Sequence, residues 1–370
     1  MSNSELKITR PDDWHLHLRD GGVLRAVLPF SSRVFARALI MPNLNPPVIG
    51  IQDALAYRQR IMQALPAGSV FNPLMTCYLT DDTDAQELIR GHKEGVFLAA
   101  KLYPAGATTN SAMGVTAIKK IYPVLEAMQA DNMPLSVHGE VTDHRVDIFD
   151  REAVFIEQVL DPLRRDFPGL RIVLEHLTSQ VAVAYVSASG QNLGATITPH
   201  HLIINRSHLF SGGMRPHMYC LPVAKREADR RALVQAATSG DSSFFLGTDS
   251  APHPVSKKET AGGCAGIFCA PYAVERICQV FDEAGALHNL EKFVSLNGPA
   301  FYRLSPNEQR ITLRRRPAWL QAEDSVKFEG GSIRMFCPSQ PLNWEICGTG
   351  STGKDALSRI GELSPACGTR

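Results

Sequence analysis

Two histidines and an arginine alternate near the start of the chain, in the run His15-Leu16-His17-Leu18-Arg19. On a β-strand, residues two apart point to the same side, so both imidazoles could reach one ion. Two hydrogen-bonded histidines on a half-buried surface strand would account for the pair equally well. Inside a buried sheet, however, three adjacent polar groups would need strong compensation, which favours a metal or ligand site.

Two further histidines and one aspartate end apolar runs later in the chain: His138, His176 and Asp249. A lone histidine at the end of a strand is more often structural. Four histidines at matching positions instead favour one zinc site, because neutral imidazole is a common zinc ligand. Asp249 could contact both a metal and a substrate. Its alternative role as a helix N-cap is weakened by Pro252 and Pro254, which oppose a regular helix there.

Lys101 lies in an apolar run, between Ala100 and Leu102. A buried ammonium is costly and tends to lose its proton. A neutral lysine amine can add carbon dioxide to become a carbamate, an anionic group whose two oxygens could bridge two cations. The alternative is a lysine that extends to solvent or pairs with a carboxylate. The residues alone leave both interpretations open.

The elements that must position these residues form a loose repeat of short apolar runs and longer amphipathic stretches. Helical spacing of apolar residues marks 53–64, 112–130 and 151–167. Eight strands alternating with helices favour a parallel α/β architecture, and a closed (β/α)8 TIM barrel is the leading prediction. An open doubly wound sheet is disfavoured, because no GxGxxG run opens a helix. The expected strands cover residues 6–11 running into 14–20, 37–43, 72–79, 97–104, 134–140, 171–177, 195–202 and 244–250.

Polar residues gather late in almost every expected strand. In a barrel this end is the face on which active sites are built, so the asymmetry favours a functional site. A purely structural barrel would be expected to carry polar residues at both ends about equally. The residues concerned are His15, His17, Arg19, Asn43, Lys101, His138, His176, His200 and Asp249.

The organisation changes after Ser250. Residues 251–266 form a Pro- and Gly-rich loop, and residues 270–283 have the pattern of a helix. Residues 311–347 contain short extended runs, which we interpret as a C-terminal addition packed on the barrel. We therefore expect one domain over residues 1–347. Residues 348–370, rich in Gly, Ser and Thr, are expected to be a mobile tail.

The composition excludes several classes of partner. The 38 basic and 37 acidic residues give a net charge of +1, which offers no electrostatic reason to expect nucleic acid or an anionic membrane. No apolar run approaches the ~18 residues of a membrane span, and the first residues lack the apolar core of a secretory signal. Eight scattered cysteines without a CxxC pair are typical of reduced thiols. We therefore expect a cytoplasmic enzyme.

Seven motifs together resemble the class II, bacterial-type dihydroorotases of the amidohydrolase superfamily. The resemblance runs from about residue 6 to residue 347. HxHxRD, the lysine strand and the final DSAPH are highly specific in combination, whereas each alone indicates only the superfamily. The motifs are HLHLRD (15–20), MPN (41–43), KLYP with ATTNS (101–111), VHGE (137–140), EHL (175–177), TPHHL (198–202) and GTDSAPH (247–253).

The resemblance implies a barrel with two zinc ions per chain, bridged by a hydroxide and by Lys101 carboxylated on its side-chain nitrogen. His15, His17 and Asp249 would bind the more buried zinc. His138 and His176 would hold the second. The substrate-binding residues implied are Arg19, Asn43 and His253 for a carboxylate, the backbone of Leu221 and Ala265 for the ring amide, and Thr108 and Thr109 on a mobile loop.

The implied reaction is the reversible, zinc-dependent cyclisation of N-carbamoyl-L-aspartate to L-dihydroorotate in pyrimidine biosynthesis. Asp249 would act as general base and then general acid. The family also suggests a homodimer. The main alternative is a dihydropyrimidinase or hydantoinase, whose substrates lack the carboxylate that Arg19 and His253 would bind. A non-catalytic scaffold of the same fold is the other alternative, but such a protein would be expected to have lost metal ligands.

Overall fold

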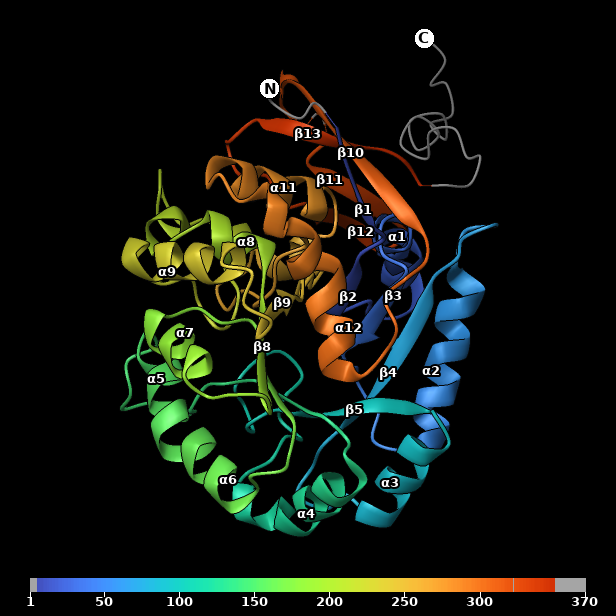
Figure 1. The fold of residues 1–370 in the computed structure, drawn as a ribbon, viewed down its shortest axis with the longest axis vertical. Coiled ribbons are helices and arrows are strands. Elements are labelled where there is room, and N and C mark those ends of the chain that lie inside the picture. Colours follow the sequence, from blue (N-terminus) through green and yellow to red (C-terminus); the bar gives the residue numbers. More distant parts are fainter. Residues whose placement is uncertain (1–4, 322, 350–370) are drawn as a thin grey trace.

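A parallel sheet of eight strands, curved into a barrel, forms the centre of the molecule (Figure 1). The computed structural model describes residues 5–321 and 323–349. At the seam the Asp249 amide donates to the His15 carbonyl at 2.8 Å, and the His17 amide donates to the Ser250 carbonyl at 3.2 Å, so the barrel nearly closes. The prediction of a (β/α)8 barrel is confirmed. The strands follow chain order: β2 (Asp12–Leu16), β3 (Arg37–Ile40), β4 (Asn72–Tyr78), β5 (Phe97–Leu102), β6 (Leu135–Val137), β7 (Ile172–Leu174), β8 (Leu193–Ile197) and β9 (Phe244–Leu246).

Helices surround the strands and bury their apolar faces against them (Figure 1). In α11, for example, Val274, Ile277, Cys278 and Phe281 are buried, the spacing of a single helical face. Within the described residues, no helix combines the length and hydropathy that a membrane span requires. The main helices are α1 (Gly21–Ser32), α2 (Ile51–Ala64), α3 (Ala85–Lys93), α4 (Tyr122–Asp131), α5 (Arg151–Phe155), η2 (Ile156–Leu160), α6 (Asp161–Asp166), α7 (Gln180–Ser187), α9 (Glu227–Thr238), α11 (Ala273–Glu283), η6 (Lys292–Leu296) and α12 (Asn297–Tyr302).

The barrel interior is apolar at one end and polar at the other. A small core that includes Trp14, Ala99, Val173 and Phe245 fills the part nearer the strand starts, and the Trp14 ring stacks on Tyr302 of α12 at 4.4 Å. Two residues after Ala99 comes Lys101, and two residues after Val173 comes Glu175, both buried. The apolar layer thus supports a polar layer at the carboxyl ends of the strands, where barrel enzymes carry their sites.

The first expected strand is in fact two strands that belong to different sheets. β1 (Glu5–Thr9) pairs antiparallel with β10 (Arg310–Trp319), which also pairs with β13 (Leu342–Thr349). A hairpin of β11 (Ser325–Phe328) and β12 (Gly331–Arg334) completes the C-terminal addition. This region was expected to have only short extended runs, so its regular sheet is a correction. Of the predicted mobile tail, residues 350–370 lie outside the described residues, whereas residues 348 and 349 end β13.

Two expected boundaries are also wrong. β8 ends at Ile197, because Thr198 caps a short helix, α8 (Pro199–Ile203), by accepting the His201 amide at 3.1 Å. His200 therefore lies on a helix and not in a strand. The expected helix over 112–130 begins only at η1 (Ile118–Ile121), because Val115 forms a bridge with Pro104. The loop over 251–266 contains one turn of helix, α10 (Val255–Lys258).

Candidate metal centre and active site

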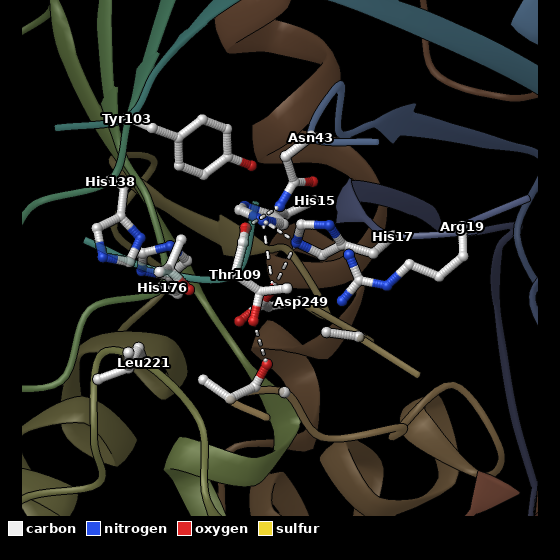
Figure 2. A pocket seen from close by; sticks show the side chains of 14 residues that line it. His15, His17, Arg19, Asn43, Tyr103, Thr109, His138, His176, Leu221 and Asp249 are labelled. Atoms are coloured by element: carbon white, nitrogen blue, oxygen red, sulfur yellow. Dashed lines mark hydrogen bonds and ion pairs between the residues drawn. The ribbon is translucent and has the colours of Figure 1, made fainter. Parts of the chain in front are cut away.

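Three ligand-type atoms converge where β2 meets the segment after β9 (Figure 2). His15 Nε2 lies 3.2 Å from His17 Nε2 and 3.4 Å from Asp249 Oδ1. His17 Nε2 lies 3.0 Å from the same carboxylate oxygen. All three residues are buried. Atoms about 2.0–2.1 Å from a tetrahedral zinc lie roughly 3.3–3.4 Å from one another, so these spacings suit a single cation.

A buried carboxylate fixes the orientation of His15. The Nδ1 of His15 lies 2.8 Å from Glu175 Oε2, which also accepts the Thr196 hydroxyl at 2.6 Å. A proton on Nδ1 leaves the lone pair of Nε2 directed at His17 and Asp249. Burial raises the pKa of Glu175, but His15, Lys101 and the two hydrogen bonds outweigh it and bring the pKa to about 2. Glu175 therefore supplies negative charge behind the cluster.

A second buried carboxylate, Asp13, links the first strand of the barrel to the segment that follows the last strand. Its oxygens accept the His15 amide at 3.1 Å, the Thr248 amide at 2.8 Å and the Thr248 hydroxyl at 2.6 Å. Burial raises the pKa of Asp13 to about 7, although the hydrogen bonds oppose the shift. Asp13 thereby places His15 beside Asp249, two residues that are far apart in the chain.

The backbone is in the left-handed region at three residues of the site. The φ angles are +59° at Arg19, +44° at His176 and +44° at Asp249. Residues other than glycine seldom adopt this conformation, and they do so chiefly where the surrounding structure determines it, as at functional sites.

The other two histidines stand on the opposite side of the pocket from Arg19 (Figure 2). The His138 and His176 rings are 4.8 Å apart between centroids, and His176 is 5.1 Å from His15. His138 Nε2 lies 2.8 Å from Glu140 Oε2, so Nδ1 is the ring nitrogen that remains for a ligand. The His176 Nδ1 is buried without a hydrogen-bond partner among the described residues. Burial lowers the pKa of His176 well below its usual range, and so keeps the imidazole neutral.

Lys101, on β5, is fully buried, and its Nζ has no hydrogen-bond partner among the described residues. Its nearest aromatic neighbour is Tyr103, whose ring centre lies 5.1 Å from Nζ. Burial lowers the pKa of Lys101 to about 8, against the opposing effect of Glu175 and Asp249. The expectation of a buried lysine is confirmed, and the alternative of a direct pair with a carboxylate is not observed.

Arg19 and its polar neighbours lie on the other side of the pocket. Its Nε donates to the Pro252 carbonyl at 3.2 Å, and its Nη2 lies 3.0 Å from His253 Nε2. The same His253 nitrogen lies 3.0 Å from the Ala265 carbonyl. Because one ring nitrogen cannot both accept from Arg19 and donate to Ala265, only one of these contacts forms at a time. The Arg19 Nη1 is buried and has no partner among the described residues.

The segment after β5 closes over this set. Asn43 Nδ2 donates to the Thr109 carbonyl at 3.0 Å, and the Thr109 hydroxyl donates to the Ala265 carbonyl at 3.2 Å. Asn110 returns a hydrogen bond to the Asn43 carbonyl at 3.0 Å. The expected loop residues therefore do lie over the pocket.

Most of the predicted site residues line one pocket. Lys101 and His253 are not part of its lining, but His253 contacts the lining residues Arg19 and Ala265. Sequence reasoning missed Tyr103, Glu175 and Asp13, although the first two occur in the quoted runs KLYP and EHL. The Tyr103 hydroxyl is buried without a partner among the described residues and points toward the pocket (Figure 2). The predicted residues in the lining are His15, His17, Arg19, Asn43, Thr108, Thr109, His138, His176, Leu221, Asp249 and Ala265.

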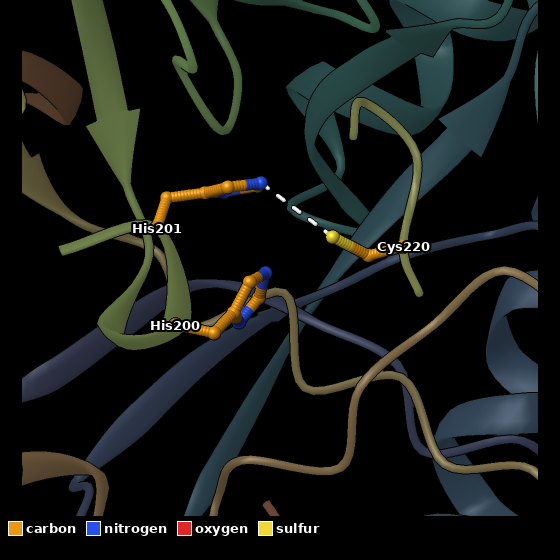
Figure 3. Close-up of side chains that lie close together, drawn as sticks. All are labelled: His200, His201 and Cys220. Carbon is orange, nitrogen blue, oxygen red and sulfur yellow. Dashed lines mark hydrogen bonds between the residues drawn. The ribbon is translucent and has the colours of Figure 1, made fainter. Parts of the chain in front are cut away.

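The ligand-type residues His200, His201 and Cys220 lie close together and form a second group (Figure 3). His201 is already hydrogen-bonded at both nitrogens, to the Thr198 hydroxyl at 2.9 Å and the Pro222 carbonyl at 3.0 Å. The Cys220 thiol donates to the same carbonyl at 3.3 Å. Burial raises the pKa of this thiol far above its usual range. Of these three residues, only His200 has ring nitrogens without hydrogen-bond partners among the described residues.

Comparison with known proteins agrees with this geometry. The amidohydrolase family model matches residues 12–312. A dihydroorotase of Chelativorans sp. is 58% identical over 92% of this chain and 99% of its own length. The crystal structure of the Campylobacter jejuni dihydroorotase has a TM-score of 0.84 at 38% identity, covering 94% of this chain and 98% of that one.

Two further solved structures are similar to this chain to different degrees. Yeast dihydroorotase in complex with 5-fluoroorotic acid has a TM-score of 0.84 at 33% identity, over 93% of this chain and 98% of that one. An L-hydantoinase from Arthrobacter aurescens has a TM-score of 0.73 at 14% identity, over 92% and 89%, and so shares the fold alone. By sequence and by structure, the chain belongs to the amidohydrolase family and, within it, to the dihydroorotases.

Proposed function

We propose that this dihydroorotase interconverts N-carbamoyl-L-aspartate and L-dihydroorotate at a site that holds two zinc ions, as one step of pyrimidine biosynthesis. The observation that carries the proposal is the convergence of His15 Nε2, His17 Nε2 and Asp249 Oδ1 within 3.0–3.4 Å. Each of these atoms has a lone pair, and without a shared proton or cation they would oppose one another. A cation between them removes the conflict.

The donor set fits a second zinc beside the first. His138 and His176 offer imidazole nitrogens next to His15, and Glu175 and Glu140 each hold one ring nitrogen, of His15 and His138 respectively. Such carboxylate–histidine pairs orient zinc ligands in proteins. The unpartnered His176 Nδ1 and Lys101 Nζ are the kind of buried polar atoms that such a site would satisfy.

Charge favours a modified Lys101. Four neutral histidines and one ligand carboxylate compensate poorly for two divalent ions, which repel each other strongly at short range. An ammonium on Lys101 would add to the positive charge. A carbamate, formed when the neutral amine adds carbon dioxide and loses a proton, would instead supply one negative charge and two oxygens. Lys101 is the buried lysine between Glu175 and Tyr103 that has no other partner in the described structure.

Arg19, His253 and Asn43 would bind the carboxylate of the substrate. A guanidinium can hold a carboxylate through two parallel hydrogen bonds, and Arg19 keeps Nη1 without a partner. The competing contacts at His253 Nε2 would be resolved on binding, because Arg19 could turn to the substrate while His253 keeps its bond to Ala265. The backbone of Leu221 and Ala265 would contact the ring amide.

Asp249 would move the proton. When bound, the zinc pair would make a water acidic enough to attack near neutral pH and would polarise the ring carbonyl. Asp249 accepts the proton of the attacking water and returns it to the ring nitrogen as the amide C–N bond breaks. The product is N-carbamoyl-L-aspartate, in which the ring nitrogen has become the terminal carbamoyl NH2. The second proton of the water is released to solvent as the new carboxyl group ionises, and cyclisation reverses each transfer. Burial raises the pKa of Asp249, which favours its use as an acid as well as a base.

We further propose a homodimer of cytoplasmic chains, each with one catalytic unit over residues 1–347, that uses a small-molecule substrate and no nucleic acid or membrane. Support comes from the family resemblance, the near-neutral charge and the free thiols of the described cysteines.

The requirement for a carboxylate separates this function from that of a hydantoinase or dihydropyrimidinase. We expect hydrolysis of dihydroorotate and no comparable hydrolysis of dihydrouracil, the same ring without the carboxylate, because Arg19 would then face an empty site. Steady-state rates on both compounds test this. Equal kcat/KM values would contradict the proposed substrate.

A further inference from the structure

Lys258, the last residue of α10, is an internal cation that no part of the proposed reaction uses. Lys258 is only 2% exposed, although α10 is a single helical turn within a loop. Its neighbour Lys257 is exposed. The Lys258 Nζ donates to three backbone carbonyls: Tyr219 at 2.8 Å, Cys264 at 2.8 Å and Gly266 at 2.7 Å. An ammonium has three donors, so its hydrogen-bonding capacity is fully used.

These three carbonyls belong to the two segments that form one wall of the pocket. Cys264 and Gly266 flank Ala265, and Tyr219 lies two residues before Leu221. The Gly266 amide also donates to the Tyr219 carbonyl at 3.1 Å, which joins the segments directly. Leu221, Ala265 and Gly266 all line the pocket. Lys258 therefore connects the two places from which the backbone reaches the pocket.

The loop around Ala265 is closely packed and is tied to the rest of the site. Gly266 has a φ of +145°, and a Cβ there would lie 2.7 Å from the Ala251 carbonyl oxygen, so the chain must pass close to its neighbours. The Ala265 carbonyl accepts from both His253 and Thr109. A shift of Ala265 would thus also disturb the groups beside Arg19. Because hydrogen bonds from a charged donor are stronger than neutral ones, the Lys258 ammonium is well suited to hold this arrangement.

We propose that Lys258 is a positioning residue for substrate binding: its ammonium fixes the spacing of the Leu221 and Ala265 backbone, and so the fit of the substrate ring amide. The inference rests on the proposed function, since it takes Leu221 and Ala265 as substrate contacts. The hydrogen bonds of the Lys258 ammonium go to these three carbonyls and, among the described residues, to no proposed metal ligand, so we expect an effect on binding and not on the chemical step.

The matched pair Lys258→Met and Lys257→Met tests this proposal in the full-length, zinc-loaded enzyme. Methionine keeps much of the length of the side chain but removes all three donors. We expect Lys258→Met to raise KM for dihydroorotate about tenfold, since a buried acceptor without its donor is costly, with kcat changed less than about threefold. Zinc content should equal that of the wild type, and Lys257→Met should match the wild type throughout. The affinity for 5-fluoroorotic acid should fall in parallel with the rise in KM.

A purely structural lysine would lower the melting temperature of Lys258→Met and leave KM unchanged, and that result would overturn the proposal. So would a loss of zinc, or an equal fall in kcat and kcat/KM. If the wild type is active and Lys258→Met behaves like it, this inference alone is contradicted. If the wild type is inactive, the proposed function is contradicted. If Lys258→Met fails to fold, hydrogen exchange on the wild type decides: we expect a slowly exchanging Gly266 amide without ligand, and exchange as fast as in a free peptide would exclude the fixed spacing.

Discussion

Two groups of buried histidines lie at the same end of the barrel. They differ in which of their polar atoms are already hydrogen-bonded to other parts of the protein. In the cluster of His15, His17 and Asp249, two imidazole nitrogens and a carboxylate oxygen face one another, and Glu175 holds His15 from behind. In the second group, the Thr198 hydroxyl and the Pro222 carbonyl already bind the polar atoms of His201 and Cys220, and His200 alone keeps ring nitrogens without partners among the described residues. The first group presents three atoms that can share a cation, whereas His201 and Cys220 are satisfied by the protein itself.

Residue type and proximity therefore do not define a metal site. A histidine whose two nitrogens are both hydrogen-bonded to the protein has no lone pair to offer without losing a bond. A histidine that donates one N–H to a carboxylate presents the other nitrogen as a ligand. The position of the hydrogen-bond partner separates the two clusters, and the following variants test that separation.

The largest effect is expected from Lys101→Ala. If a carbamate completes the first cluster, this variant should lose zinc and activity together, with kcat lowered by about 10³-fold or more, because metal-ion catalysis supplies several kcal/mol. Lys101→Glu keeps a carboxylate on a shorter stem and should retain part of the zinc. Metal analysis and turnover of both variants check this. A Lys101→Ala enzyme with full zinc and normal turnover would show that the lysine does not bridge.

Arg19→Lys should have the next largest effect, without any loss of zinc. The variant keeps the charge but not the paired hydrogen bonds, so we expect kcat/KM for dihydroorotate to fall by about 100-fold. Arg25→Lys, an exposed change in α1, is the matched control and should behave as the wild type. Unchanged kinetics for Arg19→Lys would mean that the carboxylate is bound elsewhere.

The segment over 105–113 should give a smaller effect. Removing both hydroxyls, in Thr108→Ala with Thr109→Ala, breaks the contact to the Ala265 carbonyl and should lower turnover about tenfold by weakening closure. Zinc content should stay the same. Thr142→Ala, outside the pocket, serves as the control. Wild-type turnover in the double variant would reduce this segment to an ordinary surface loop.

The smallest effect is expected in the second cluster. Cys220→Ala removes a thiol that donates to the Pro222 carbonyl and should cost about 1 kcal/mol of stability. Because His201 and Cys220 are already hydrogen-bonded to the protein, the zinc content per chain should not change. A loss of one zinc per chain would instead assign a metal to His201 and Cys220, and would remove the distinction between the clusters.

Much of the barrel is predictable from the sequence because each buried strand is a short apolar run with polar residues at its end. His138 and His176 stand out for the same reason. The boundary at Ile197 is not predictable from apolar runs, because Thr198 and Pro199 begin a helix inside a run that resembles a strand. The cap at Thr198 was the available signal.

Other features depend on contacts between distant parts of the chain. β1 pairs with β10, about 300 residues away, so nothing local separates it from β2. Glu175 follows an apolar run, but its role depends on His15 lying 160 positions earlier. Asp13 likewise acquires its role only when Thr248 reaches it. Such partners of the ligands require the closed barrel, and a sequence pattern does not show them.

The most direct test of the central claim is the number of zinc ions per chain, measured on the same preparation as dihydroorotate hydrolysis. We expect about two zinc ions per chain, loss of activity when a chelator removes them, and recovery when zinc is restored. Mass spectrometry of the intact, metal-loaded chain should also show the added mass of one carbon dioxide at Lys101. A metal-free preparation that hydrolyses dihydroorotate at the full rate would contradict the account.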